Sequence, residues 1–222
     1  MATSESQTIS RYLESIYYMN AEGEHVRAAR LAEWLGISQP TTGATLRRMI
    51  RDGLVQISAA REVTLTTHGQ QTAERIVRRH RVAERWLTDV LGLDWVEADE
   101  EAGKLEHALS DEVAERLYQH IGRPATCPHG NPIPGADTVA RKPERALRDL
   151  PPGEKAKVRR VSEVAEHDAP HLLRFLGDSG LRIGAEVAAT ERNPGAGTVT
   201  VEVGGRRVAM SLDVAGKIWV GL

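Results

Sequence analysis

The run from Val26 to Thr66 constrains the fold of this chain more than any other segment. Two segments with a helical spacing of apolar residues, 26–35 and 41–51, flank Gly36, which suits the left-handed conformation that often ends a helix. Ser38 can cap the second helix, and the proline that follows is tolerated in a first turn because that amide has no helical partner. The pattern predicts two helices joined by a tight turn.

A hairpin is predicted directly after these helices. The β-rich runs 54–57 and 62–66 enclose a turn that ends in Arg61, which gives the hairpin a basic tip. With an earlier helix over 9–19, the order is helix, helix, turn, helix, hairpin, as in a winged helix-turn-helix. On the third helix the apolar Ala44, Leu46, Met49 and Ile50 are expected to face inward. The residues expected to contact DNA are Ser38, Gln39, Pro40, Thr41, Thr42, Arg47, Arg48 and Arg61.

Side chains that bind transition metals gather between residues 80 and 129. His80 and Glu84 are four residues apart, so on a helix they project from one face. The others stand in a second long helix predicted over 96–121 and in a proline- and glycine-rich loop over 122–135. Imidazole, carboxylate and thiolate together suit a divalent transition metal better than calcium or magnesium, which prefer oxygen. The candidate ligands are His80, Glu84, Glu106, His107, Cys127 and His129.

Composition narrows the class of protein. The 222 residues are 41% hydrophobic and 27% charged, as in soluble globular proteins, and no apolar run approaches the length of a membrane span. The first residues lack the basic and apolar regions of a secretory signal, and the single cysteine excludes an intramolecular disulfide framework. These features predict a cytoplasmic protein. The net charge is only −2, but an arginine-rich strip over 75–85 precedes an acidic one over 94–115, as expected for binding both phosphates and cations.

Strand patterns dominate the C-terminal part. Runs at 155–161, 186–191, 198–203, 207–212 and 217–220 read as strands, with a short helix over 169–176. The pair Gly204-Gly205 is a signal for a two-residue hairpin. A polar, proline-bearing stretch over 141–153 is the best candidate for a linker to this part. The pattern predicts a small β-barrel of SH3 type.

The chain resembles the diphtheria toxin repressor family of iron- and manganese-dependent transcriptional repressors over nearly its whole length. The resemblance is carried by ARLAEWLGISQPTTGATLRRMIRDGLV, RRHRVAERWLTDVLGLDW, EHALSDEVAERL and PHGNPIPG. It implies an α+β protein with a winged helix-turn-helix DNA-binding domain, a helical metal-binding and dimerisation domain and an SH3-like (FeoA-type) domain. The expected boundaries are 1–72 for the first, 73–140 for the second, 141–153 for the linker and 154–222 for the third.

The resemblance also implies a function. It predicts a metal-dependent repressor of metal-homeostasis genes that binds a palindromic double-stranded DNA operator as a homodimer. The cofactor would be Mn²⁺ or Fe²⁺, with Zn²⁺ or Co²⁺ as substitutes in vitro. Apolar residues spaced by four in the second long helix are expected to form a continuous ridge for the dimer contact. They are Leu105, Leu109, Val113 and Leu117.

Two metal sites beside the connecting helix are implied by the same resemblance. The ancillary site would take His80 and Glu84. One branch of the family completes it with a Cys-Pro-His loop and an acid of the SH3-like domain, and another branch with a histidine at the position of Asp99. In this sequence those positions hold Cys127, His129, Asp168 and the potential carboxylate ligand Asp99.

The primary site contains Glu106 and His107 but departs from the family pattern. Gly103 stands where the family has Cys or Glu, and Arg11 where it has Met or Asp. A guanidinium is not a ligand and would repel a cation. Either Glu14, one turn further along the helix, supplies a carboxylate, or the site stays empty and Arg11 pairs with Glu106. The sequence predicts that the His80 site binds metal more tightly than the Glu106 site.

Two other functions compete with this prediction. A hydrolytic metalloenzyme would need an open coordination position and a general base in a cleft. The ligands here are spread over helices and a loop, and neither an HExxH motif nor a nucleophile elbow occurs, so no enzyme activity is expected. A winged-helix regulator that has lost its metal response is the other alternative, and Gly103 and Arg11 support it.

Overall fold

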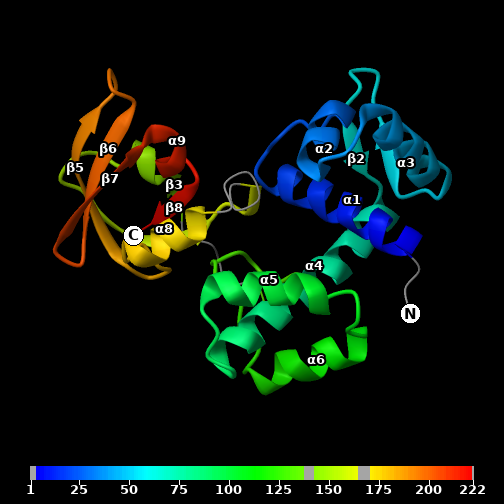
Figure 1. Ribbon diagram of the computed structural model, residues 1–222. Helices are drawn as coiled ribbons and strands as arrows, with labels where there is room; N and C mark the ends of the chain where they lie inside the picture. The colour runs from blue at the N-terminus through cyan, green and yellow to red at the C-terminus, as the bar shows by residue number, and fades with distance from the viewer. Residues whose placement is uncertain (1–3, 138–142, 165–170, 222) are drawn as a thin grey trace. The chain divides into compact units, whose positions relative to one another are not determined.

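The computed structural model describes residues 4–137, 143–164 and 171–221. Its chain divides into two compact units (Figure 1). The first consists of Met1–Leu93, Glu97–Arg123 and Ile133–Gly135, and the second of Asp94–Val96, Pro124–Pro132 and Ala136–Leu222. The candidate ligand Asp168 lies outside the described residues. Within the described ranges, no helix has both the length and the apolar character needed to cross a membrane.

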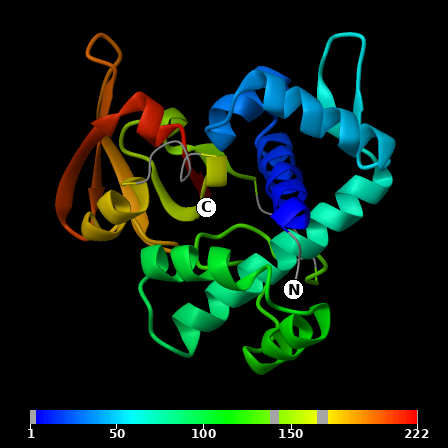
Figure 2. The same ribbon diagram turned by 45° about the vertical axis from the view of Figure 1, so that its right-hand side comes forward.

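The first unit begins with the predicted winged helix-turn-helix. Gly36 ends α2 in the left-handed conformation, with φ 65°, and the Ser38 hydroxyl accepts a hydrogen bond from the Thr41 amide at the start of α3. The antiparallel strands β1 and β2 form the wing, whose loop projects from the helices in Figures 1 and 2. The elements are α1 (Ser4–Ala21), α2 (Ala28–Leu35), α3 (Gln39–Arg51), β1 (Val55–Ile57) and β2 (Val63–Leu65).

The connecting helix α4 (Thr67–Asp89) is the longest element of the first unit. The Thr66 hydroxyl caps its start by accepting from the Gly69 amide. A side chain at Gly69 would collide with the Leu54 carbonyl, so the glycine allows α4 to approach the wing closely. The helix packs against α1, beside which it lies in Figures 1 and 2, and against α6 (Asp111–His120).

The prediction of one long helix over 96–121 is wrong, because the chain turns near the middle of this range. Helix α5 (Trp95–Leu105) ends before Glu106, and Ser110 caps the start of α6 by accepting from the Val113 amide. Asp111 and Glu112 then complement the positive end of the α6 dipole. A capping serine followed by two acids is the signal that should have divided the helix.

This division has two consequences for the predicted sites. Glu106 and His107 lie in the turn between α5 and α6 instead of on a helix face. The expected apolar ridge is also not continuous, since Leu105 ends α5 and Val113 lies on α6. Both of these side chains are nevertheless exposed, by 36% and 44%. Helix α5 packs on α4 through the small residues Ala83, Ala98 and Ala102.

The second unit is built on an antiparallel sheet of six described strands in the order β3-β8-β4-β5-β6-β7. Gly204 and Gly205, with φ 53° and 75°, form the predicted two-residue hairpin between β6 and β7. The strands are β3 (Arg145–Ala146), β4 (Lys155–Val161), β5 (Glu186–Asn193), β6 (Thr198–Val203), β7 (Arg206–Ser211) and β8 (Ile218–Gly221). The helices are η1 (Leu147–Asp149), α8 (Leu172–Asp178) and α9 (Leu212–Ala215).

An apolar core fills this unit and includes part of the stretch that was expected to be a linker. Leu147 and Leu150 are buried in the core, and Arg145 and Ala146 pair with β8. The linker expectation rested on charge and proline content, which did not reveal that the interspersed leucines are buried. Trp95 belongs to the same core.

Candidate functional site

His80 on α4 lies among carboxylates. Its Nδ1 is 2.7 Å from a Glu106 oxygen, and its Nε2 is 3.3 Å from Asp99 and 3.8 Å from Glu84. Burial acts to lower the pKa of His80, but the hydrogen bonds with Asp99 and Glu106 and the charge of Glu84 outweigh it and raise this pKa well above 6.5. The surrounding carboxylates thus favour positive charge at this position, whether a proton on the imidazole or a bound cation carries it.

Glu14 on α1 adds another carboxylate to this cluster. It is only 8% exposed, and burial, together with the charge of Glu106 and a hydrogen bond between the two side chains, raises the pKa of Glu14 to about 8. Glu106 is also buried and lies 3.4 Å from the His107 ring. Two buried carboxylates that cannot both ionise easily indicate a site with an excess of negative charge.

The sequence left two arrangements open around Glu106, one with Glu14 as a ligand and one with Arg11 paired to Glu106. Glu14 is buried, and the nearby charge of Glu106 contributes to its raised pKa, whereas Arg11 is exposed. Among the described residues no ion pair joins Arg11 to Glu106, and the use of Glu14 as a ligand stays a prediction. His80 and Glu106, which the resemblance assigns to two different sites, form a hydrogen bond with each other.

The cluster fits a divalent transition metal. The ligand atoms of His80, Glu84 and Asp99 all lie within 4.8 Å of one another. Two ligands at about 2.1 Å from one ion lie at most about 4.2 Å apart, so small side-chain shifts would bring these atoms to coordinating distance. A cation would also offset the repulsion that raises the pKa of Glu14. Gly103 supplies no ligand, but a side chain at this exposed position would meet nothing within 4 Å.

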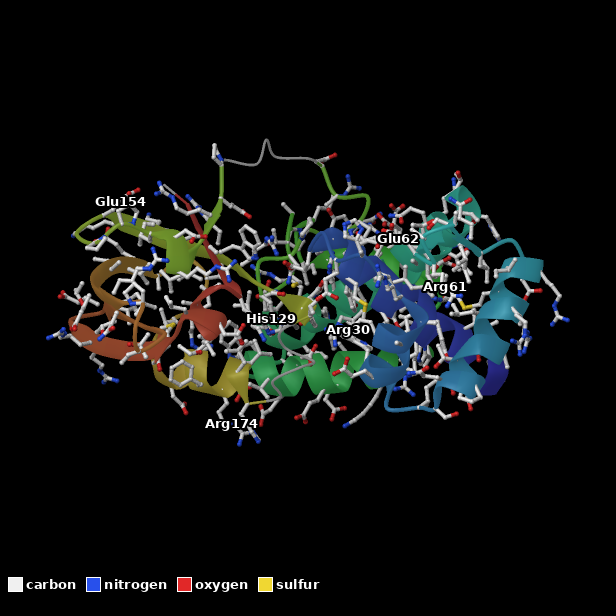
Figure 3. All side chains as sticks on the ribbon, turned by 90° about the horizontal axis from the view of Figure 1, so that it is seen from above. Arg30, Arg61, Glu62, His129, Glu154 and Arg174 are labelled. Carbon is white, nitrogen blue, oxygen red and sulfur yellow. The ribbon has the colours of Figure 1, made fainter. Side chains whose placement is uncertain are left out.

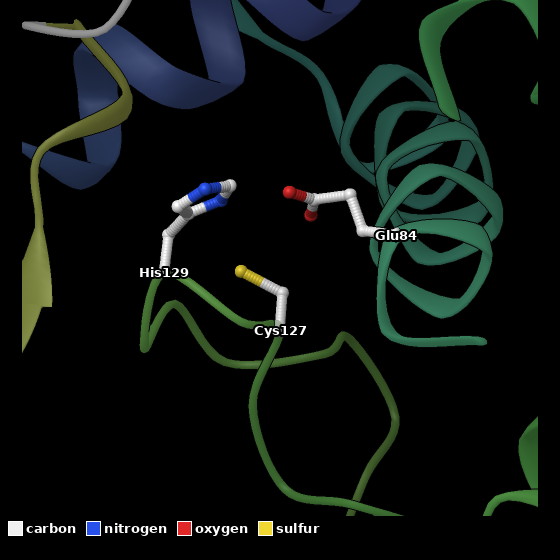
Figure 4. Close-up of side chains that lie close together, drawn as sticks. All are labelled: Glu84, Cys127 and His129. Carbon is white, nitrogen blue, oxygen red and sulfur yellow. The ribbon is translucent and has the colours of Figure 1, made fainter. Parts of the chain in front are cut away.

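Cys127 and His129 form a second pair of potential ligands, within the second unit. Both are buried, and their ligand atoms lie within 4.8 Å of each other. The Cys127 amide donates to the Asn131 carbonyl, and the Gly130 amide donates to the Cys127 carbonyl, which closes a tight turn. Figure 4 shows the thiol and the imidazole projecting from this turn.

The turn is attached to strand β4. The Val161 amide donates to the His129 carbonyl, and the Asn131 amide group donates to the Val161 carbonyl. Gly130 has φ 83° and lies so close to Arg159 that any side chain would collide with its carbonyl. Asn131 and Gly130 are thus placed to support the two potential ligands, although sequence reasoning did not single them out. Their presence in the PHGNPIPG motif was the available signal.

The start of α3 presents most of the predicted DNA-contacting residues. Ser38, Gln39, Pro40 and Thr41 are exposed. Thr42 differs from the expectation, because it is 0% exposed and its hydroxyl donates to the Ser38 carbonyl. The inward-facing set was also partly wrong, since Ala44 is exposed and Ile50 is 42% exposed.

Basic side chains flank this surface. Arg47 is exposed, and Arg48 is partly buried with its guanidinium 3.7 Å from Asp52. Arg61 lies exposed at the tip of the wing, beside Glu62 (Figure 3). It has φ 60°, a left-handed conformation that few residues other than glycine adopt without strain. Arg61 therefore places its charge at the tip of the wing in a backbone conformation that would be less strained for glycine.

A winged helix-turn-helix followed by a buried imidazole-carboxylate cluster defines the class of metal-dependent DNA-binding regulators. The sequence matches three family descriptions in succession: "Iron dependent repressor, N-terminal DNA binding domain" over residues 5–63, "Iron dependent repressor, metal binding and dimerisation domain" over 66–135, and "FeoA domain" over 145–222. The chain belongs to the iron-dependent repressor family.

Relatives and solved structures agree with this assignment. The diphtheria toxin repressor of Corynebacterium efficiens is 38% identical, covering 96% of this chain and 94% of its own. The iron-dependent repressor IdeR of Mycobacterium tuberculosis is 37% identical, covering 96% of each chain. A solved "Manganese-dependent transcriptional repressor complex with manganese" has a TM-score of 0.83 and 34% identity, covering 96% of this chain and 98% of its own. The homologues are transcriptional repressors and not enzymes.

Proposed function

We propose that this protein is a repressor of metal-homeostasis genes that binds a palindromic operator as a homodimer when Mn²⁺ or Fe²⁺ is bound. The observation that carries the proposal is the cluster around His80, which lies on the helix that directly follows the wing. Its imidazole and carboxylates suit Mn²⁺, Fe²⁺, Zn²⁺ or Co²⁺. The names of the relatives, which specify manganese or iron, favour the first two ions.

The ligands that we assign fall into two groups. The first consists of His80, Glu84, Asp99, Glu106, His107 and Glu14. The second consists of Cys127 and His129, which we propose to bind a metal together with Glu84 and, from the C-terminal domain, Asp168. Metal binding by ligands from separate elements would order the parts of the chain that carry them. Such ordering needs only a few kcal/mol of differential affinity to change DNA occupancy strongly.

DNA recognition is assigned to α3 and the wing. Helix α3 would enter the major groove, where Gln39 and its exposed neighbours reach base edges and nearby phosphates. Arg47, Arg48 and Arg61 would contact phosphates. Because phosphate contacts are independent of sequence, Arg47→Ala should weaken binding to any DNA and lower the salt slope by about one unit. Gln39→Ala should lower the preference for the operator, and equal losses on operator and random DNA would refute its role.

The dimer contact is assigned to the α5–α6 region, which falls in the matched metal-binding and dimerisation domain. Leu105 and Val113 are exposed there, and burying apolar area contributes about 25 cal/mol per Å². Two copies would place their recognition helices about 34 Å apart, one turn of DNA. Analytical ultracentrifugation at micromolar concentration should find a dimer. A monomer both with and without metal would contradict this part of the proposal.

Operator binding by fluorescence anisotropy, in Mn²⁺ or Fe²⁺ and then in excess chelator, tests the function as a whole. The wild-type protein should lose operator affinity in chelator. His80→Ala should abolish the metal response, because His80 contacts the carboxylates of both proposed groups, whereas His107→Ala should be milder. Glu191→Gln serves as the control, because Glu191 is exposed on β5 and lies outside the assigned metal, DNA and dimer contacts. Operator binding that is indifferent to chelator would instead support a regulator that has lost its metal response.

A further inference from the structure

Trp95 packs against the imidazole of His129 inside the second unit. The two ring centroids are 5.2 Å apart, and the planes are tilted by 33°. Trp95 is buried and is the first residue of α5, far in sequence from the turn that carries His129. We propose that Trp95 is a positioning residue that holds the His129 ring in the orientation needed to bind metal. This inference rests on the proposed role of Cys127 and His129 as ligands.

The backbone contacts of the turn do not by themselves orient the His129 ring. The hydrogen bond from Val161 fixes the main chain at His129, but it does not fix the two side-chain torsions that aim the ring. A ligand that is already aimed loses less conformational entropy when the ion arrives. Metal-binding histidines are usually oriented by a neighbouring group, and loss of that group lowers metal affinity by about 10- to 100-fold. Here the face of Trp95 supplies the constraint.

Trp95 is itself held in place by residues of the second unit. A side-chain carbon added at Gly177 on α8 would lie 3.1 Å from the indole Nε1, so α8 packs closely against the edge of the ring. The guanidinium carbon of Arg182 lies 5.3 Å from the Trp95 ring centroid, in cation–π range. The rest of the indole packs in the apolar core. An indole that is held by these contacts can restrict the orientation of the neighbouring His129 ring.

A purely structural role for Trp95 makes a different prediction. If the indole only fills the core, then any change that loosens this core equally should weaken metal binding equally. Leu181, a buried member of the same core, provides the matched control as Leu181→Ala. Trp95→Phe keeps an aromatic face beside His129, whereas Trp95→Leu keeps apolar volume without that face. Gly177→Ala leaves the indole in place but presses on its edge.

The test is a Co²⁺ titration of the full-length protein, followed by the thiolate-to-cobalt charge-transfer absorption. Cys127 is the only cysteine, so this absorption reports the second ligand group and not the His80 cluster. Trp95→Leu should weaken Co²⁺ binding at the thiolate by about tenfold or more, Gly177→Ala should act in the same direction, and Trp95→Phe should restore affinity to within about threefold of wild type. Thermal denaturation of each variant measures the loss of stability.

Two results would overturn the role of Trp95. One is a Trp95→Leu protein with wild-type Co²⁺ affinity, and the other is an equal loss of affinity in Leu181→Ala at matched stability. Failure of the proposed ligand set has a separate signature, because the charge-transfer absorption would then be missing in the wild-type protein or would persist in Cys127→Ser. In that case the inference about Trp95 falls together with the set on which it rests.

Discussion

Replacing Glu14 by glutamine should stabilise the metal-free protein while weakening its response to metal. The pKa of Glu14 rises from 4.5 to about 8 on folding, chiefly because the side chain is buried. The folded protein therefore binds a proton that the unfolded chain releases, so stability falls as pH rises between these two values. Glutamine cannot ionise, and so Glu14→Gln removes this loss.

The magnitude follows from the two pKa values. Each unit of pKa corresponds to about 1.36 kcal/mol, so ionisation of Glu14 opposes folding by at most about 5 kcal/mol above pH 8 and by about 3 kcal/mol at pH 7. Near pH 4.5 Glu14 is protonated in the folded wild type, so its charge should cause little difference in stability between the wild type and Glu14→Gln. The raised pKa of His80 contributes stability that is likewise lost as pH rises, but His80 is present in both proteins and largely cancels in their comparison.

Urea denaturation in excess chelator at pH 5, 7 and 8.5 measures the effect. Glu14→Gln should gain stability relative to wild type progressively with pH, and the exposed control Glu112→Gln should not. Added Mn²⁺ should then narrow this difference. A metal ion at 100 times its Kd stabilises the wild-type protein by about 2.7 kcal/mol. The variant should gain less, because a neutral amide replaces a carboxylate ligand. Equal stabilities at pH 8.5 without metal would refute the reasoning, because Glu14 would then not carry a folding-linked proton.

Three further substitutions probe other parts of the structure. Arg61→Gly should raise the free energy of unfolding by up to about 1 kcal/mol, because glycine adopts this positive φ without strain. The same change should lower the affinity for all DNA. A loss of stability in denaturation would contradict the first expectation. Thr42→Val should lower the free energy of unfolding by about 1 kcal/mol, because the hydrogen bond to the Ser38 carbonyl is lost. The ratio of operator affinity to random-DNA affinity should not change. A selective loss of operator affinity would show that Thr42 contacts bases. Gly130→Ala places a side chain at a positive φ and against the Arg159 carbonyl, so it should lower stability by about 2–3 kcal/mol. Thermal denaturation measures this loss. A wild-type melting curve would mean that the turn adjusts without strain.

Much of the fold could be predicted from short-range patterns. The turn at Gly36, the cap at Ser38 and the Gly204-Gly205 hairpin depend on the conformational preferences of single residues, which act wherever the residue stands. Strands β4 and β6 have the predicted bounds because alternation of apolar residues is visible over a few positions. The division of the helix after Leu105 was also encoded locally, by the Ser110 cap, and was missed because apolar spacing continued across it.

The candidate site could be predicted only in part, because its members were identifiable but their neighbours were not. The types and spacing of His80, Glu84 and the Cys127–His129 pair already indicated transition-metal ligands. Glu106 was also among the ligands named from the residues alone, and resemblance offered Glu14 as one of two alternatives. Sequence spacing within one helix could not reveal which ligands from different elements would approach one another, and the hydrogen bond between His80 and Glu106 is an example.

What the sequence by itself determined about this protein is therefore its elements, its family and the chemistry of its ligands. Tertiary structure alone decided the hydrogen bond between His80 and Glu106, the burial that raises the pKa of Glu14, and the stacking of Trp95 on His129. The physical reason is that local propensity acts through a residue and its near neighbours in the chain. Contacts between side chains on different elements, and the exclusion of water that shifts a pKa, exist only once those elements have packed.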